Sequence, residues 1–209
     1  MLGRPHQVAP LMESLRATVP DARVLWCLSP DDHEVHRAVD GTGCERIVVP
    51  YQPRGDYARK INHGYRLTTQ PLVFTGAGDL VFHPGWFEAA AAELRPGVGV
   101  VGVNDLGSPR VVAGEHATHF LVTRTYADEH GTIDERGKIF HEGYPHEFVD
   151  DELVATAKRR GMWAMAIGSH VEHLHPNWGK GQNDGLYAAQ PTRMRLGRPI
   201  YRRRQRLWA

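Results

Sequence analysis

The sequence predicts an α/β protein with a mainly parallel sheet flanked by helices and a mixed C-terminal half. Segments with helical apolar spacing alternate with short, continuous apolar runs along residues 7–103. Such runs are typical of strands buried on both faces, as in parallel sheets. One run, within Pro71–Pro84, ends at a glycine-lined opening that holds one carboxylate, Asp79. Open α/β sheets bind ligands at the carboxyl ends of strands, so a phosphorylated ligand and its metal are expected there.

The first four elements are predicted from apolar spacing and capping residues. Residues 7–18 place apolar side chains at helical spacing, and residues 22–28 form the continuous apolar run of a buried strand. Residues 31–39 are typical of a short helix that begins at an acidic capping residue. Residues 46–49 are expected to form the second strand.

The same alternation continues to residue 103. Residues 56–67 are expected to form a helix and residues 72–75 the third strand. Residues 84–94 are rich in alanine and begin with a proline, which favours the first turn of a helix. Residues 98–103 are predicted to form a strand whose glycines indicate that another group approaches closely.

The second half has a different pattern. Residues 119–123 are predicted to form a strand and are followed by a polar stretch. Residues 150–160 carry acidic residues in their first turn and basic residues in their last, which matches a helix dipole. A strand at residues 163–167 and an extended segment at residues 170–175 follow, and the chain is expected to end in a helix.

Composition bounds the class of protein. The hydrophobic content of 41% and charged content of 23% are those of a globular protein, with one domain expected at residues 1–191 and an Arg-rich helix or tail at residues 192–209. The sequence carries no apolar run of the length of a membrane helix and no secretory signal, so we expect a cytoplasmic protein. The two cysteines, Cys27 and Cys44, lack the spacing of a zinc knuckle or disulfide framework.

The tail carries a strong positive charge. Seven arginines and no acidic residue follow Pro191, whereas the rest of the chain has 18 basic against 24 acidic residues, a net charge of −6. One hypothesis is a helix that packs Leu196, Ile200, Tyr201 and Leu207 on the body with its arginines in water. The alternative is contact with a membrane surface, a nucleic acid or a protein partner.

Several side chains could carry chemistry. His173 and His175 share one face if their segment is extended, so both could bind one ion, although a hydrogen-bonded structural histidine is the simpler interpretation. Asp79 could be a metal ligand or only a turn cap. Asp150 and Asp151 begin a predicted helix, where either could cap the helix or serve as a general base.

Taken together, these features resemble the GT-A nucleotide-diphospho-sugar transferases, in particular the family 2 inverting glycosyltransferases, over residues 3 to 178. The segment 60–64 is similar to the Ala-Arg-Asn-x-Gly helix of that family, and Asp79, 17 residues after Asn62, matches the second carboxylate of its Asp-x-Asp motif. The resemblance implies a nucleotide-diphosphate sugar as donor and Asp150, or Asp151, as catalytic base. It also implies a divalent metal, Mn²⁺ or Mg²⁺, at Asp79 with His173 or His175. The donor-binding residues that it implies are Arg4, Asp31, Asp32, Lys60, Asn62, Gly78 and Asp79.

The sequence departs from the family pattern at two points. Ala77 replaces the first carboxylate of the motif, and only Met1 and Leu2 precede the segment that resembles the loop after the first strand. We therefore expect either a weakly held metal or its partial replacement by Lys60 and Arg4. The alternatives are a degenerate GT-A protein that binds nucleotide, glycan or a partner without catalysis, and a metal-dependent nucleotidyltransferase or hydrolase. The acceptor is open: a glycan, a protein, a lipid-linked sugar or a modified nucleic-acid base.

Overall fold

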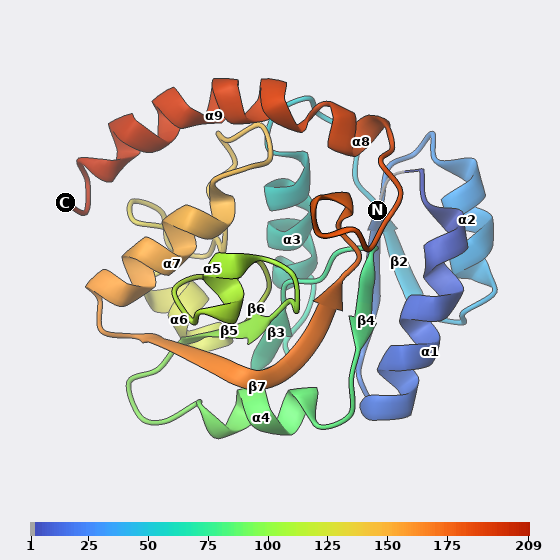
Figure 1. Cartoon of the computed structure of the whole chain (residues 1–209), viewed down its shortest axis with the longest axis horizontal. Helices are drawn as coiled ribbons and strands as arrows, with labels where there is room; N and C mark the ends of the chain where they lie inside the picture. The colour runs from blue at the N-terminus through green and yellow to red at the C-terminus, as the bar shows by residue number, and fades with distance from the viewer. Residues whose placement is uncertain (1–2) are drawn as a thin grey trace.

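The computed structural model describes residues 3–209 and confirms the α/β class (Figure 1). The strands are β1 (Leu25–Leu28), β2 (Glu45–Val48), β3 (Leu72–Phe74), β4 (Leu80–Phe82), β5 (Val100–Asn104), β6 (Phe120–Thr123) and β7 (Trp163–His173). The helices are η1 (Pro5–Gln7), α1 (Val8–Thr18), α2 (His33–Asp40), α3 (Asp56–Arg66), α4 (Trp86–Ala92), α5 (Pro109–Val112), α6 (Arg124–Glu129), α7 (Val149–Arg159), η2 (Pro176–Trp178), α8 (Gly185–Ala188) and α9 (Gln190–Gln205).

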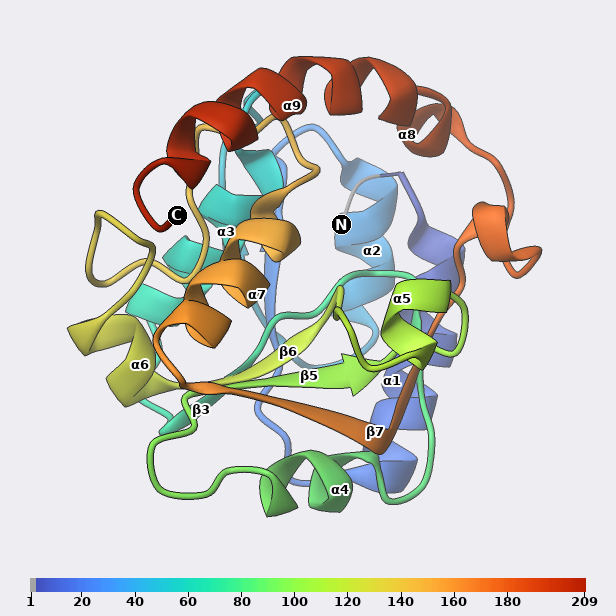
Figure 2. The same cartoon turned by 60° about the vertical axis from the view of Figure 1, so that its left-hand side comes forward.

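The strands form a two-stranded and a five-stranded sheet. The first is the parallel pair β1–β2, and the second has the order β3-β6-β5-β7-β4. Figure 2 shows β3, β6, β5 and β7 of the larger sheet. Within the larger sheet only β5 and β7 run parallel, and the other three pairings are antiparallel. The pairing is therefore more mixed than the mainly parallel sheet that the apolar runs indicated, because continuous burial does not distinguish the two strand directions.

Helices cover both faces of the larger sheet. β5 is buried along its whole length, and its successive side chains point to opposite faces. Val101 and Val103 join a cluster built with α1, α2 and α4, whereas Val100 joins a second cluster built with α3, α6 and α7. The predicted close approach at a strand glycine is present at Gly102, where a Cβ atom would lie 2.5 Å from the side chain of Ala117.

Most predicted elements lie within a few residues of their observed bounds, with differences late in the chain. The strand predicted at 163–167 and the extended segment at 170–175 belong largely to one strand, β7, which a bulge interrupts opposite Val103 and Asn104. The short elements β4, α5, α6 and α8 were not predicted from the sequence. They are three to six residues long, which is too short for a recognisable period of apolar residues.

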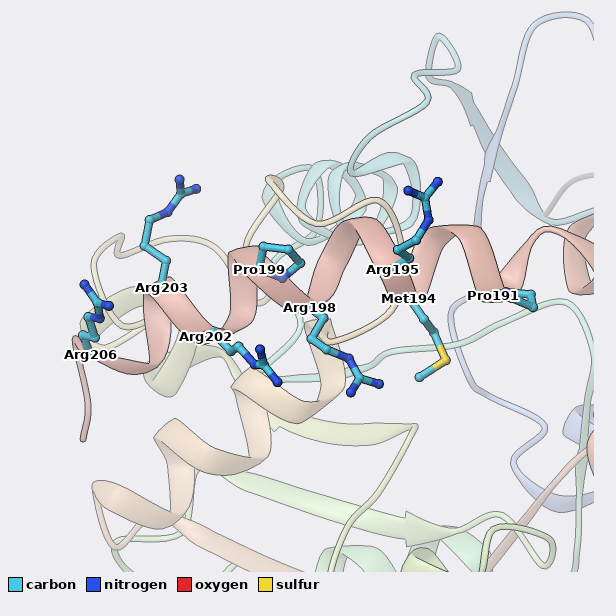
Figure 3. A pocket seen from close by; sticks show the side chains of 8 residues that line it. All are labelled: Pro191, Met194, Arg195, Arg198, Pro199, Arg202, Arg203 and Arg206. Carbon is cyan, nitrogen blue, oxygen red and sulfur yellow. The ribbon is translucent and has the colours of Figure 1, made fainter.

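The C-terminal helix α9 lies across α3 and α7 and packs on the body (Figure 1). Ile200 and Tyr201 contact the core as expected, but Leu196 and Leu207 are exposed. The expectation that the arginines face water is wrong for Arg204, which is buried in ion pairs, and correct for those labelled in Figure 3. Across residues 3–209, no helix combines the length and apolar character needed to cross a membrane.

Candidate functional site

Asp79 lies between the glycine-rich turn after β3 and the start of β4. β4 pairs antiparallel with β7, which sets Leu80 opposite His173 and so brings Asp79 beside His173. Asp79 is 4% exposed, and its Oδ1 lies 3.5 Å from Nε2 of His173. Burial raises the pKa of Asp79, but the hydrogen bond and charge of His173 and the charge of Arg4 outweigh burial and lower this pKa well below its usual range. Asp79 is therefore a buried carboxylate that stays ionised.

Two distant segments meet at the other oxygen of Asp79. The guanidinium of Arg4, in the N-terminal loop, and the hydroxyl of Tyr187, in α8, both donate to Oδ2. Nε of Arg4 donates to Asp184 at 2.6 Å, and the guanidinium carbon lies 4.4 Å from the centroid of the Tyr187 ring. Asp184 in turn caps α8 by accepting from backbone N–H groups. The N-terminal loop, β4 and α8 thus form one hydrogen-bonded cluster around Asp79.

Three histidines pack next to this cluster. The ring centroid of His173 lies 5.1 Å from that of His119 and 5.2 Å from that of His175. Burial, with the charge of His173, lowers the pKa of both His119 and His175 to about 4. Nδ1 of His175 accepts from the backbone of Asn177, and its ring lies 4.3 Å from that of Tyr187, centroid to centroid. His173 is therefore the histidine of the predicted pair that faces Asp79, whereas His175 packs.

His119 is a residue that the sequence analysis did not select. It is 4% exposed, its Nδ1 lies 3.0 Å from the carbonyl oxygen of Thr75, and its Nε2 has no hydrogen-bond partner within the described chain. The only sequence signal was the high density of histidines, eight of 13, between His116 and His175. The density of histidines along the sequence does not indicate which of them is buried beside a carboxylate.

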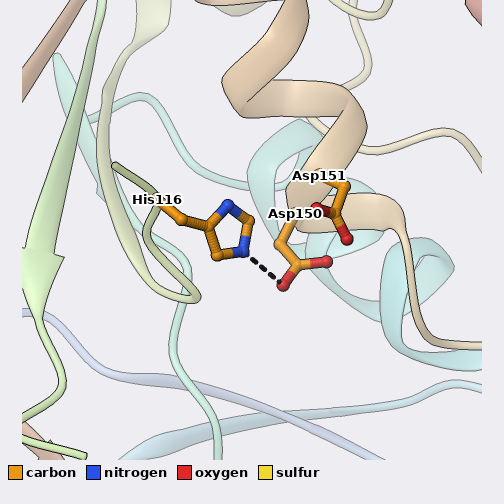
Figure 4. Close-up of side chains that lie close together, drawn as sticks. All are labelled: His116, Asp150 and Asp151. Atoms are coloured by element: carbon orange, nitrogen blue, oxygen red, sulfur yellow. Dashed lines mark hydrogen bonds and ion pairs between the residues drawn. The ribbon is translucent and has the colours of Figure 1, made fainter. Parts of the chain in front are cut away.

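A second carboxylate site lies at the start of α7 (Figure 4). Nε2 of His116 lies 3.2 Å from Oδ2 of Asp150, and Arg110 donates to Asp151 at 3.1 Å. Burial raises the pKa of Asp150, but the hydrogen bond and charge of His116 outweigh it, so this pKa lies below its usual range. Burial and the charge of Asp150 raise the pKa of Asp151. Asp150 is consequently the more acidic of the two carboxyl groups.

Tyr57 of α3 reaches from the helix to the end of β3. It is half-buried, and its hydroxyl donates to the carbonyl oxygen of Thr75 at 3.4 Å. Burial, then the charge of Asp150 and that of Asp79, raise the pKa of Tyr57. Nδ1 of His119 lies at the same carbonyl oxygen, and the ring of His119 packs on that of His173. Tyr57 therefore reaches the end of β3 next to the histidines that flank Asp79.

The residues predicted on α3 are held by protein partners. Lys60 is 5% exposed and donates to Oγ of Ser29 and to Asp56, each at 2.7 Å. Asn62 is fully buried, and its amide bonds the backbone of residues 139–140 and the carboxylate of Glu142. The expected donor contact of Asn62 is corrected: this side chain positions the 139–142 loop, because all of its polar atoms are already used.

The acidic residues after β1 lie beside the N-terminal loop. Asp32 accepts from the backbone N–H of Gly3 at 2.7 Å, which ties it to the loop that carries Arg4. Asp31 is exposed and points to no partner within the described residues. Gly78 directly precedes Asp79 and is partly buried. Of the predicted donor-binding residues, Arg4, Gly78 and Asp79 are therefore in one place, with Asp32 bonded to the adjoining Gly3.

A metal would find two ligands of suitable type at Asp79. A carboxylate and an imidazole suit Mn²⁺ or Mg²⁺, although such ions usually take further oxygen ligands from substrate phosphates and water. Ala77 supplies no carboxylate here, and Oδ2 of Asp79 already accepts from Arg4 and Tyr187. The residues fit a weakly held ion at Asp79 and His173, whereas His175 packs on the Tyr187 ring.

Comparison with known proteins yields structural matches only: no protein-family profile and no curated protein sequence matches the chain. A mannosyltransferase from Pyrobaculum calidifontis, solved with GDP-Man and Mn²⁺, matches with a TM-score of 0.63 and 15% identity over 92% of this chain and 58% of that one. A glucosyl-3-phosphoglycerate synthase from Mycobacterium tuberculosis, solved with Mn²⁺, UDP and glucosyl-3-phosphoglycerate, matches with a TM-score of 0.58 and 13% identity over 90% of this chain and 72% of that one.

Another structure of that synthase, solved with phosphoglyceric acid, matches over 79% of this chain and 66% of that one, with a TM-score of 0.54. The chain thus spans less than two thirds of the length of the mannosyltransferase. At sequence identities of 13% and 15%, the similarity to these proteins concerns the fold alone and not the activity. On this evidence, the protein has the GT-A fold of nucleotide-sugar glycosyltransferases.

Proposed function

We propose that the protein is an inverting glycosyltransferase that moves a sugar from a nucleotide-diphosphate donor to an acceptor hydroxyl. The observation that carries this proposal is a pair of carboxylates, each held beside basic side chains. Asp79 contacts Arg4 and His173. Asp150 contacts His116. An inverting transfer needs two such groups, one on the diphosphate side of the sugar and one on the acceptor side. The GT-A fold, with the ligands of its structural neighbours, supports the same class of donor.

In this proposal Asp150 is the general base. Its carboxylate accepts the proton of the acceptor hydroxyl while the acceptor oxygen bonds to the anomeric carbon. The bond from that carbon to the diphosphate oxygen breaks, and the diphosphate leaves with the electron pair. His116 keeps Asp150 ionised and fixes its orientation through the 3.2 Å contact. Asp151 is the reserve candidate, although its raised pKa and its pairing with Arg110 favour Asp150.

The diphosphate side would be organised by Asp79, His173 and Arg4. Asp79 and His173 would hold a divalent ion, which when bound neutralises part of the charge on the leaving diphosphate. Arg4 is permanently charged and lies at the same carboxylate, so it is placed to contact phosphate oxygens once Asp79 turns to other ligands. Lys60 is bonded to Asp56 and Ser29 and would assist only if it exchanged these partners for the donor.

The test is the release of nucleoside diphosphate from a panel of sugar nucleotides, with and without Mn²⁺. We expect turnover by the wild type, little by Asp150→Asn, and wild-type turnover by Asp21→Asn, an exposed carboxylate outside the site. Release of pyrophosphate instead would indicate a nucleotidyltransferase. Equal turnover by Asp150→Asn and the wild type would refute the base assignment.

A second candidate function is binding without catalysis. The observations that favour it are Ala77 in place of a motif carboxylate and the occupation of Asp79 by Arg4 and Tyr187. Calorimetry with nucleoside diphosphates would then detect binding while no donor of the panel turns over. The cytoplasmic location stays a prediction.

A further inference from the structure

Helix α9 and the residue that follows it, Arg206, together carry five arginines without an acidic partner, which we call the five-arginine face. Its members are Arg195, Arg198, Arg202, Arg203 and Arg206. All five are exposed, and none forms an ion pair with any described carboxylate. The other two arginines of the tail behave differently: Arg193 pairs with Glu147, and Arg204 pairs with Glu152 and Asp134. The face is therefore the part of the tail charge that the fold itself does not use.

The orientation of α9 is fixed by its buried side. Gly197 is buried against Phe148, where a Cβ atom would come within 2.8 Å of the Phe148 ring. Arg204 is 6% exposed, and Tyr201 stacks on Phe148 with 5.4 Å between ring centroids. At about 1.5 Å per residue, the five-arginine face extends for roughly 16 Å along the helix. A rigid support thus presents a row of cations to the outside (Figure 3).

The hollow along this face does not suit a nucleotide or another small ligand. It has a volume of about 780 Å³, and the five arginines line it together with Pro191, Met194 and Pro199. Every charged group in the lining is positive, and no aromatic ring is present to stack on a base. Ligand sites usually combine apolar walls with a few convergent polar groups of different kinds. The row of charge fits an extended anionic surface instead.

The neighbouring side chains distinguish between two such surfaces. Met194, Leu196 and Leu207 are exposed beside the arginines, with exposed fractions of 37%, 43% and 54%. The aromatic residues of the tail face inward, since Tyr201 stacks on Phe148 and Trp208 is 8% exposed. Single-stranded nucleic acids are bound by aromatic stacking, which this face lacks. Basic helices with exposed aliphatic side chains bind the interface of anionic bilayers.

We propose that the five-arginine face binds an anionic membrane surface. Arginines lie among the phosphate headgroups, while Met194, Leu196 and Leu207 reach the boundary with the acyl chains. This contact sets α8 and α9 against the bilayer. α8 carries Tyr187, which touches Asp79, and Arg204 binds Glu152, two residues beyond Asp150. The membrane-facing elements are therefore those that cover the candidate active site, but the proposed binding itself does not depend on that activity.

Vesicle co-sedimentation of the full chain tests this proposal. The probes are phosphatidylcholine vesicles with and without phosphatidylserine, at low and high salt. We expect binding to the anionic vesicles that weakens as salt rises, because the attraction is screened. The triple variant Arg195→Gln/Arg202→Gln/Arg206→Gln loses three charges, which lowers membrane partitioning by about 100-fold. Leu196→Ser with Leu207→Ser also lowers partitioning, with little change in salt dependence.

A matched control removes the same charge elsewhere. Arg37, Arg66 and Arg95 are exposed on α2, at the end of α3 and after α4. Their triple Gln variant should bind anionic vesicles nearly as the wild type does, and thermal unfolding confirms that both triple variants are folded. Equal loss in both triples, equal binding to neutral vesicles, or tighter binding to single-stranded nucleic acid than to anionic vesicles would each overturn the proposal.

Discussion

The buried ion pairs of Arg204 make the tail part of the fold, and their removal should be costly. Arg204 donates to both carboxylate oxygens of Glu152, each at 2.7 Å, and to both oxygens of Asp134 at 2.8 and 2.7 Å. Glu152 is 3% exposed and otherwise accepts one side-chain hydrogen bond, from the hydroxyl of Tyr144 at 2.7 Å. Arg204→Gln therefore leaves a buried carboxylate without its cation.

The magnitude follows from the burial of Glu152. Breaking a buried ion pair by removing one partner costs about 3–5 kcal/mol, because the remaining charge is desolvated and uncompensated. For a chain of this size, 1 kcal/mol shifts the unfolding temperature by about 2–4 °C, so Arg204→Gln should unfold roughly 6–20 °C lower than the wild type. The neighbouring Arg203→Gln, at an exposed position, should change stability by no more than about 0.5 kcal/mol.

Thermal and denaturant unfolding measure this difference, and acid adds a second signature. The hydrogen bonds from Arg204 lower the pKa of Asp134 to about 2. Because the pKa of Asp134 is lower in the folded than in the unfolded chain, where it is about 4, its ionised carboxylate stabilises the folded protein above pH 4. This stabilisation is lost as the pH falls toward 2. Arg204→Gln should weaken this acid dependence. If Arg204→Gln and Arg203→Gln unfold at the same temperature and pH, the tail is not held by this network.

Three further predictions concern the candidate active site. Asp150→Asn should lower donor turnover by about 100-fold or more with unfolding temperature preserved, and full activity in both this variant and Asp151→Asn would remove the assignment. His116→Gln should move the acid limb of the pH–activity profile to higher pH, since His116 lowers the pKa of the Asp150 carboxylate; an unshifted limb would contradict its role. Calorimetry should detect little Mn²⁺ binding to the free protein and clear Mn²⁺ binding in the presence of nucleoside diphosphate. Ala77→Asp should raise the Mn²⁺ affinity in both conditions. If the Mn²⁺ affinity of this variant equals that of the wild type, and the wild type turns over donor fully in EDTA, the site is metal-independent.

Local sequence signals were sufficient for the class of fold and for much of the element order. Apolar period and caps located α1, α3 and α7 to within about two residues, because each has a clear amphipathic face or a charged first turn. Apolar period and capping residues did not indicate the direction of the strands. The antiparallel pairing of β5 with β6 and its parallel pairing with β7 depend on long-range packing, which a run of valines does not encode.

The site was predictable in part. Asp79 and His173 could be chosen from residue type and co-linear spacing, and the β4–β7 register explains why they meet. The contacts of Tyr187 and Arg204 could not, since each joins residues separated by 52 or more positions through side chains of otherwise ordinary surface type. For Asn62 the motif position suggested a ligand contact. In the structure Asn62 is fully buried, and its hydrogen bonds position the 139–142 loop instead.

The charges around Asp79 explain why a donor and an ion should bind together. Arg4 is the permanent cation that contacts Asp79, and it is already paired with Asp79 and Asp184. The lowered pKa of His119 and His175 keeps both neutral near pH 7. A diphosphate brings further negative charge that Arg4 alone does not balance, so it binds better when a cation enters with it. A divalent ion alone meets a single carboxylate, because Ala77 supplies none. Each ligand therefore raises the affinity for the other, and linkage requires that the two effects be equal.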